Sequence, residues 1–290
     1  MVIILIFMKF YIVDAFTSEP FGGNTAGVVL LEEGIEFPGD LLMQKIAAQL
    51  RYSETAFIKQ NGTNDFTIRY FTPEGEVDLC GHATIASFKV LIECGKATKG
   101  DICLSRTLAG DLNVYVGEQI MMDMATPQVV GKEVDIEKLY RIMTGREMEM
   151  APGVPVEIIS TGLPDIILPL ASVEELQSLK PDMQALAQLS KEMEVTGVHA
   201  FAIADDNYTA HVRNFAPLYG IDEESATGTA NGALSYYLFR HGIAKEGDRC
   251  TYLQGEAMGR ASEITAQIEK GGKIKVGGNA AIMAMGELLL

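Results

Sequence analysis

A few residues in this chain could move a proton or attack a carbon atom. Glu54 lies between Ser53 and an apolar stretch, and a carboxylate held beside apolar side chains is suited to general acid and base work. His82 lies in the sequence GHAT soon after Cys80, where the imidazole could shuttle a proton and the thiol could act as a base. Glu224 precedes a second small-residue segment and could orient His82 or a substrate.

Each of these residues also has a structural interpretation. Glu54 could be a capping or surface residue, and His82 could be a hydrogen-bonded structural histidine. Acidic residues such as Glu223 and Glu224 are common before a helix because they complement its dipole. Both interpretations stay open at this point.

An internal repeat indicates which elements must position these residues. Three matches occur in the same order, two at an offset of 213 − 69 = 144 and one at 247 − 100 = 147. Three ordered matches favour a duplicated unit of about half the chain. The matches are RYFTP at 69–73 with RNFAP at 213–217, AF at 56–57 with AF at 200–201, and GDIC at 100–103 with GDRC at 247–250.

The repeat also marks what is not shared. At the offset of 144, Glu54 has Val198 as its counterpart. If a charged residue of one copy is replaced by an apolar residue in the other, the fold that both copies share does not require the charge. The asymmetry therefore favours Glu54 as a site residue.

The predicted elements agree in the two copies. In the first, Asp40 is expected to cap an amphipathic helix ending near Leu50, and Asp182 is expected to open its equivalent. A helix that is apolar over most of its circumference ends near Cys94 in the first copy and near His241 in the second, so both are expected to be buried. The predicted strands are 55–58, 66–71, 104–116 and 119–124, then 199–204, 208–215, 249–253, 262–269 and 273–285.

These patterns predict an α+β fold of two pseudo-symmetric lobes, each a β-barrel-like sheet wrapped around a central apolar helix. The N-terminal lobe is expected over residues 1–127, with the last strand near 280–290 a candidate to return to it, and the C-terminal lobe over 128–290. Residues 128–151 are interpreted as a connection with a short helix around 136–143.

Equivalent small-residue turns at 79–84 and 226–232 each open a central helix. If the lobes meet about an approximate two-fold axis, the unpaired amides of both turns would point into one cleft. Two positive helix ends would bind a carboxylate there, which predicts an active site in the cleft between the lobes. The alternative is that the glycines only allow tight turns and close packing.

Composition excludes several classes of function. With 23 Lys+Arg against 39 Asp+Glu, the formal charge of −16 argues against binding to nucleic acid or an anionic membrane. The apolar run 2–7 is too short to cross a bilayer, and we expect a soluble, cytoplasmic protein. Four cysteines without a CxxC pair and four scattered histidines give no disulfide framework and no zinc pattern, so no metal is expected.

The motifs resemble those of the PhzF-like phenazine biosynthesis family, whose members share the two-lobed diaminopimelate epimerase fold. The resemblance covers almost the whole chain from Lys9 onward and implies that Met8 is the natural start, with residues 1–7 an upstream extension. The motifs are VDAF and GGN within 13–24, SETAF at 53–57, RYFTP and CGHAT within 69–84, RNFAP and ATGTANGAL within 213–234, and QGEAMGR at 254–260.

The resemblance implies a cofactor-free isomerase that moves a proton along a conjugated ring system, with a homodimer expected. It implies a proton relay by Glu54, with His82 and Glu224 as further catalytic residues. The family commonly has EDPATGSA where this chain has EESATGTA, so the contact of the longer Glu224 and the geometry of its loop differ. The residues that the resemblance places beside the substrate are Ser53, Gly81, Ala83, Gly228, Thr229 and Ala230.

The resulting hypothesis is an isomerase of a small carboxylate-bearing metabolite. A rival within catalysis is an epimerase or racemase that uses Cys80 as its only thiol, although Thr227 at the equivalent position argues against the two-cysteine chemistry of related racemases. A carboxylate-binding protein without turnover is a further alternative. An interaction protein with an adhesive methionine surface is disfavoured because the 14 methionines are scattered.

Overall fold

The computed structural model describes residues 7–145 and 153–289, which fall into two compact units. The first unit comprises Met1–Asp123 with Gly277–Leu290, and the second comprises Met124–Val276. Both are mixed α+β structures dominated by sheet, which confirms the predicted fold class. Of residues 1–7, which were predicted to be an upstream extension, only Phe7 lies within the described part of the chain.

The first unit is built on a sheet with the strand order β18-β1-β2-β3-β4-β6-β7-β8, and β5 pairs with β4. The pairs β2–β3 and β4–β6 are parallel and the others are antiparallel. The strands are β1 (Phe7–Ala15), β2 (Asn24–Leu30), β3 (Thr55–Gly62), β4 (Asp65–Phe71), β5 (Glu76–Val77), β6 (Ile102–Thr107), β7 (Gly110–Val116), β8 (Ile120–Asp123) and β18 (Ala280–Leu289).

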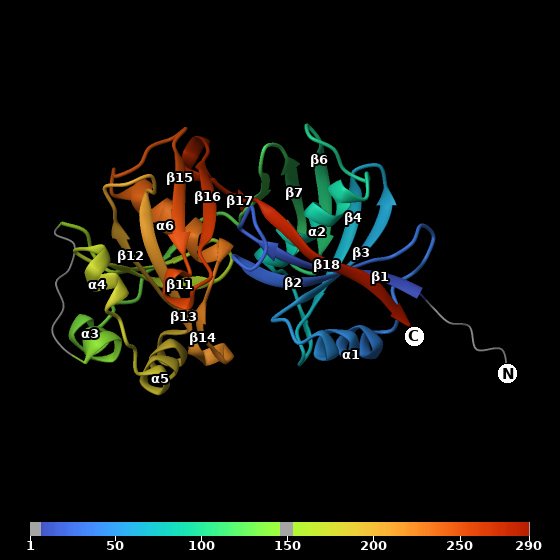
Figure 1. The fold of residues 1–290 in the computed structure, drawn as a ribbon. Coiled ribbons are helices and arrows are strands. Elements are labelled where there is room, and N and C mark those ends of the chain that lie inside the picture. The colour runs from blue at the N-terminus through green and yellow to red at the C-terminus, as the bar shows by residue number, and fades with distance from the viewer. Residues whose placement is uncertain (1–6, 146–152, 290) are drawn as a thin grey trace. The chain divides into compact units, whose positions relative to one another are not determined.

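A buried helix, α2 (Gly81–Glu93), forms the centre of this unit (Figure 1). It packs against β1, β2, β3, β8 and β18. Nine of its 13 residues are buried, and a helix without a polar face must be covered on all sides. The sheet therefore wraps around α2, while α1 (Asp40–Leu50) covers its outer face through Met43, Ile46 and Ala47.

The second unit repeats this topology in the strand order β9-β10-β11-β12-β13-β15-β16, with β14 paired to β13. The pairs β11–β12 and β13–β15 are parallel, like β2–β3 and β4–β6. The strands are β9 (Gln128–Val130), β10 (Glu157–Ser160), β11 (Pro164–Pro169), β12 (Gly197–Ile203), β13 (Ala210–Ala216), β14 (Ile221–Glu224), β15 (Arg249–Gln254) and β16 (Ser262–Ile268). A further strand, β17 (Ile274–Gly278), runs across the end of this unit at Val276.

The central helix of the second unit is α6 (Gly228–Arg240), which again has nine buried residues out of 13 and packs on β10, β11, β12 and β16. An outer helical layer packs over the other face of the sheet. Its helices are α3 (Ile136–Thr144), α4 (Val173–Gln177) and α5 (Met183–Met193). Three single-turn 3-10 helices lie at Pro217–Tyr219, Glu256–Met258 and Lys270–Gly272.

The arginine of the repeated RYFTP and RNFAP segments has the same role in both units. Arg69 donates from Nε to Glu76 Oε1 at 2.7 Å and from Nη2 to Oε2 at 2.5 Å. Arg213 binds Glu223 in the same bidentate way, at 2.9 and 2.7 Å. Such paired bonds fix geometry as well as charge, so the shared arginine joins β4 to β5 and β13 to β14.

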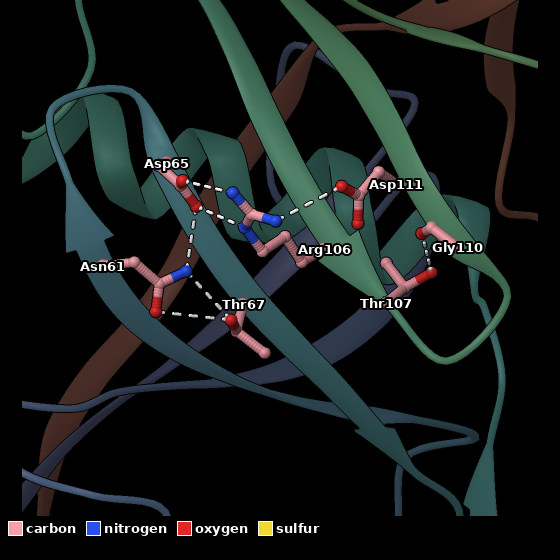
Figure 2. A network of polar contacts seen from close by, with 7 residues as sticks. All are labelled: Asn61, Asp65, Thr67, Arg106, Thr107, Gly110 and Asp111. Carbon is pink, nitrogen blue, oxygen red and sulfur yellow. Dashed lines mark hydrogen bonds and ion pairs between the residues drawn. The ribbon is translucent and has the colours of Figure 1, made fainter.

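A polar network joins β4, β6 and β7 on the surface of the first unit (Figure 2). Arg106 donates to both carboxylate oxygens of Asp65, at 2.9 and 2.7 Å, and to Asp111 at 3.3 Å. These bonds lower the pKa of Asp65 from its ordinary value to about 2, because the hydrogen bond from Arg106 favours the charged form. The network is exposed, so its contribution to stability is modest.

One predicted helix cap was wrong, and its predicted equivalent was confirmed. Asp40 does not cap its helix: Gly39 is the N-cap residue, and Asp40 instead forms an ion pair with Arg69 at 2.9 Å. Asp182 does cap α5, by accepting hydrogen bonds from the amides of Gln184 and Ala185. The connection predicted over 128–151 contains β9 and α3, and its residues 146–151 lie outside the described part of the chain.

The strand predicted over 273–285 is two strands that separate at Asn279. The second of these, β18, pairs with β1 along its length, so the last strand of the chain belongs to the sheet of the first unit (Figure 1). Pattern alone could not place this break, because both strands continue the same apolar alternation.

The register of the two equivalent hairpins corrects the predicted counterpart of Glu54. Thr55 pairs with Phe71, whereas Val198 pairs with Phe215. Since the shared arginines make Phe71 equivalent to Phe215, the residue equivalent to Glu54 is Gly197 and not Val198. The asymmetry is therefore larger than predicted, because the second unit has no side chain at this position.

The interior of the second unit contains a network of buried polar side chains, whereas the equivalent positions of the first unit share a single hydrogen bond. His199 accepts a hydrogen bond from Asn214 Nδ2 on Nδ1 and contacts Asn231 Oδ1 through Nε2, both at 3.3 Å. Burial lowers the pKa of His199 to about 3, so the ring is neutral at physiological pH. At the positions equivalent to Asn214 and Asn231, Tyr70 and Thr84 share one 2.7 Å hydrogen bond.

Asp165 lies in the same interior. Burial, followed by the charge of Glu224, raises the pKa of Asp165 to about 7, and the side-chain hydrogen bond of Asn214 opposes this shift. Oδ1 of Asp165 is buried without a hydrogen-bond partner among the described residues. Charging this carboxyl group therefore costs folding free energy.

No helix in the described part of the chain is both long and apolar enough to span a membrane.

Replacing Gly197 with alanine should destabilise the protein. The added Cβ would lie 1.8 Å from the carbonyl oxygen of Phe215, so the backbone must shift, at a cost of about 1 to 3 kcal/mol. Thermal unfolding of Gly197→Ala checks this against Gly62→Ala, another strand glycine whose new Cβ would meet no atom within 4 Å. Equal melting temperatures would contradict the observed packing.

Replacing Asp165 with asparagine should flatten the dependence of stability on pH. The folded protein binds the Asp165 proton up to about pH 7, whereas the unfolded chain loses it near 3.8, so stability falls as pH rises through this window. The melting temperature of Asp165→Asn minus that of the parent should therefore increase from pH 5 to pH 8. We expect an increase of at least about 2 to 4 °C, which corresponds to 1 kcal/mol in a chain of this size. In the control variant Asp222→Asn, which changes an exposed residue, the melting temperature should instead depend on pH as it does in the parent.

Candidate active site

Four polar side chains meet at the start of α2 in the first unit. Glu54 Oε2 lies 3.2 Å from His82 Nε2, and Ser53 Oγ lies 3.4 Å from the same nitrogen. Cys80 Sγ lies 3.4 Å from the other ring nitrogen of His82, Nδ1. The structure thus brings together a carboxylate, an imidazole, a hydroxyl and a thiol that are up to 29 residues apart in the chain.

The local backbone explains this meeting. Glu54 immediately precedes β3, and its carbonyl oxygen accepts a hydrogen bond from Gly27 on the neighbouring strand β2. Cys80 is the N-cap residue of α2, and His82 is the second residue of that helix. The start of β3 and the first turn of the central helix therefore hold the two halves of the cluster.

The carboxylate of Glu54 is largely removed from solvent. The side chain of Glu54 is 17% exposed and that of His82 is 6% exposed. Oε2 of Glu54 is fully buried and accepts no hydrogen bond of normal geometry from the described residues. Because a buried carboxylate oxygen usually has donors, this atom is available for a proton, a ligand or a cation.

Two residues that sequence reasoning did not assign support this cluster. Asn24 Nδ2 lies 3.5 Å from His82 Nδ1. Asp14, which is 2% exposed, accepts hydrogen bonds from Thr25 Oγ1 at 2.5 Å and from the amide of Phe21 at 2.8 Å, so it fixes the loop that leads to Asn24. Asp14 belongs to the VDAF motif and Asn24 to the GGN motif, so both were noticed as parts of motifs. Their distance in sequence from His82 meant that the contact of Asn24 with His82 could not be predicted without the fold.

Both central helices begin with amides that have no acceptor within the helix. The first intrahelical bond of α2 runs from Thr84 to Cys80 and that of α6 from Asn231 to Thr227, so the amides of residues 81–83 and 228–230 precede them. Neither Cys80 nor Thr227 makes a side-chain cap. These are the two turns from which an anion-binding role was predicted, and each helix end carries a partial positive charge.

The remaining predicted site residues lie in the second unit. Glu224 Oε2 accepts a 2.6 Å hydrogen bond from the hydroxyl of Thr227, while Gln254 donates to the carbonyl of Glu224 at 2.8 Å. Thr229 is partly buried and accepts a bond from Thr161 on its carbonyl oxygen, and the neighbouring Gly228 and Ala230 are buried. Glu223 is engaged by Arg213, so it has a structural role in that unit.

Ser53, Glu54, Gly81, His82 and Ala83 therefore form one group of predicted site residues in the first unit. Gly228, Thr229, Ala230 and Glu224 form a second group in the other unit. Ala83 and Ala230 are both fully buried.

The whole chain can be compared with known proteins. The family model for phenazine biosynthesis-like protein (PhzC-PhzF) matches residues 13–286. An uncharacterized isomerase from Clostridium acetobutylicum is 35% identical over 303 residues, with 97% of each chain covered. The trans-2,3-dihydro-3-hydroxyanthranilate isomerase of Pseudomonas chlororaphis is 29% identical, covering 97% of this chain and 99% of that protein.

Among solved structures, the phenazine biosynthesis protein of the PhzF family from Bacillus anthracis superposes with a TM-score of 0.86. It is 25% identical, and the match covers 98% of this chain and all of that one. A family model over nearly the full length, relatives that are isomerases and a matching fold agree with the resemblance inferred from the motifs. The chain is an isomerase of the PhzF-like phenazine biosynthesis family.

Proposed function

We propose that the protein isomerises a small carboxylate-bearing metabolite by moving one proton between two carbon atoms, without a cofactor, and that Glu54 carries the proton. The observation that supports this most directly is the buried Oε2 of Glu54, which lies 3.2 Å from His82 Nε2 and accepts no hydrogen bond of normal geometry from the described residues. The second unit has glycine at the equivalent position, so the shared fold does not require this carboxylate.

In the proposed reaction, the Glu54 carboxylate accepts a proton from one carbon of the substrate. The electron pair of that C–H bond enters the conjugated system of the substrate, and the Glu54 carboxylic acid then returns the proton to a different carbon. Atoms and electrons balance within one molecule, and nothing is oxidised or reduced. A well-positioned residue that acts first as general base and then as general acid contributes a factor of about 10² to 10⁴ in rate.

His82 and Ser53 are proposed to stabilise the two protonation states of Glu54. The ring nitrogen Nε2 lies between the carboxylate and the Ser53 hydroxyl, at 3.2 and 3.4 Å, so it can donate to either oxygen. The near-complete burial of His82 keeps bulk water from competing for its contacts with Glu54 and Ser53.

The substrate class follows from the amides at the helix starts and from a relative. The amides of Gly81 and Ala83 at the start of α2 have no acceptor within their own helix, and the same holds for those of Gly228, Thr229 and Ala230 at the start of α6; a helix start of this kind suits a carboxylate group. Glu224 is proposed as a further catalytic residue, with its position set by Thr227. The Pseudomonas chlororaphis relative is named for a cyclic hydroxylated carboxylate, which supports small cyclic carboxylates as the first candidates.

Replacing Glu54 with glutamine should abolish turnover and leave ligand binding nearly unchanged, because the amide keeps the shape but cannot accept the proton. Ligands would first be found by thermal stabilisation with a panel of small cyclic and amino carboxylates. Incorporation of solvent deuterium into the bound carboxylate, followed by NMR, should then fall by about 10² or more in Glu54→Gln. The exposed control Glu33→Gln should exchange at the parent rate.

Exchange that survives in Glu54→Gln would reject Glu54 as the proton carrier. Binding without any exchange in the parent protein would instead favour a carboxylate-binding protein without turnover.

A second candidate function is one-thiol epimerisation with Cys80 as the base. The contact of 3.4 Å between Cys80 Sγ and His82 Nδ1 favours it, because an adjacent imidazole can accept the thiol proton. The equivalent position in the second unit is Thr227, so only one thiol is present.

Replacing Cys80 with serine separates the two candidates. If Glu54 carries the proton, deuterium exchange in Cys80→Ser should stay within a few-fold of the parent, because the hydroxyl can still contact His82. A loss of 10² or more would assign the proton transfer to the thiol. Cys94→Ser, which removes an exposed cysteine, is the matched control.

A further inference from the structure

Glu54, Cys80 and His82 offer a carboxylate oxygen, a thiol sulfur and an imidazole nitrogen that all lie within 4.8 Å of one another. The first and third of these atoms are 3.2 Å apart, and Cys80 Sγ lies 3.9 Å from His82 Nε2. All three side chains are buried or nearly so. Three different donor atoms thus converge from two elements, the start of β3 and the start of α2.

The spacing matches what a small tetrahedral cation requires. Bonds of about 2.0 to 2.3 Å from Zn²⁺ to nitrogen, oxygen and sulfur place neighbouring ligand atoms roughly 3.4 to 3.6 Å apart. The observed separations of 3.2 and 3.9 Å lie on either side of this range. The third pair, a carboxylate oxygen of Glu54 and Cys80 Sγ, lies within 4.8 Å, so binding requires the side chains to move closer together around the ion.

Charge and ligand type favour the same cation. A thiolate and a carboxylate together carry two negative charges, which a divalent ion neutralises in a site with little access to water. Sulfur and imidazole ligands select zinc-like ions over Mg²⁺ and Ca²⁺, which prefer several oxygens. The buried Oε2 of Glu54, which accepts no hydrogen bond of normal geometry from the described residues, would gain a partner.

We infer that Glu54, Cys80 and His82 form a three-ligand site for Zn²⁺ or a similar thiophilic divalent cation, with the fourth position open. Binding displaces the proton of the Cys80 thiol into solution and uses neutral His82 through Nε2. Asn24, 3.5 Å from His82 Nδ1, is placed to hold the ring in this orientation. An ion in this site occupies the lone pairs that proton transfer needs, so it inhibits the enzyme reversibly; this inhibition, unlike the binding, rests on the proposed function.

The binding is tested without any substrate by titrating the reduced, metal-free protein with Co²⁺, which reports its ligands in the absorption spectrum. We expect one equivalent to bind, with intense visible bands of a tetrahedral ion and a near-ultraviolet thiolate-to-cobalt charge-transfer band. Zn²⁺ should displace the cobalt and remove both features.

Variants assign the ligands. Cys80→Ser should lose the charge-transfer band and weaken Co²⁺ affinity at least tenfold, and Glu54→Gln should weaken affinity while keeping the band. Cys94→Ser removes the exposed cysteine and should match the parent. Circular dichroism of each variant verifies that it is folded, and the parent titration stands even where a variant is not.

The inference is overturned if the parent shows no charge-transfer band, or if the band persists in Cys80→Ser. It is also overturned if binding is lost in Cys94→Ser instead. The cobalt spectra require no turnover, so they test the metal site independently of the proposed function. Either the metal site or proton transfer by Glu54 can be rejected while the other is upheld. Inhibition of exchange by Zn²⁺, reversed by a chelator, tests the consequence for activity once a substrate is known.

Discussion

The burial of an apolar helix inside each sheet is the constraint on which the rest of the molecule depends. A helix with nine buried residues out of 13 has no face to give to solvent, so strands must cover it along its length. Only its ends then present backbone polar groups, and the N-terminal end carries amides that the helix itself cannot satisfy. The same requirement that builds the core therefore leaves a polar, positively polarised turn at the edge of each unit.

The two copies use this common turn differently. In the first unit, a thiol, an imidazole and a carboxylate gather there, and Glu54 Oε2 accepts no hydrogen bond of normal geometry from the described residues. In the second, Thr227, Gln254 and Asn231 bind one another and the backbone. Duplication thus allowed one copy to bond its polar groups at this turn while the other kept a carboxylate oxygen, Glu54 Oε2, without a hydrogen-bond partner among the described residues.

Much of the fold could be predicted from the sequence because it rests on local patterns. The repeated RYFTP and RNFAP segments, the apolar helices and the cap at Asp182 each depend on residues close in the chain. The counterpart of Glu54 could not be predicted, because residues 197–202 of β12 are buried on both faces of the sheet and their pattern does not fix the register. Only the pairing of Thr55 with Phe71 and of Val198 with Phe215 reveals it. Asn24 and Asp165 were missed for a related reason, because their partners are distant in sequence.

The return of β18 to β1 has a consequence for biosynthesis. The second unit is one uninterrupted stretch, Met124–Val276, whereas the first lacks its edge strand until the last residues are made. On the ribosome, β1 must therefore wait with an unpaired edge for more than 260 residues of synthesis, while the downstream unit can complete its sheet first. The sheet of the first unit can therefore be completed only after the whole of the second unit has been synthesised.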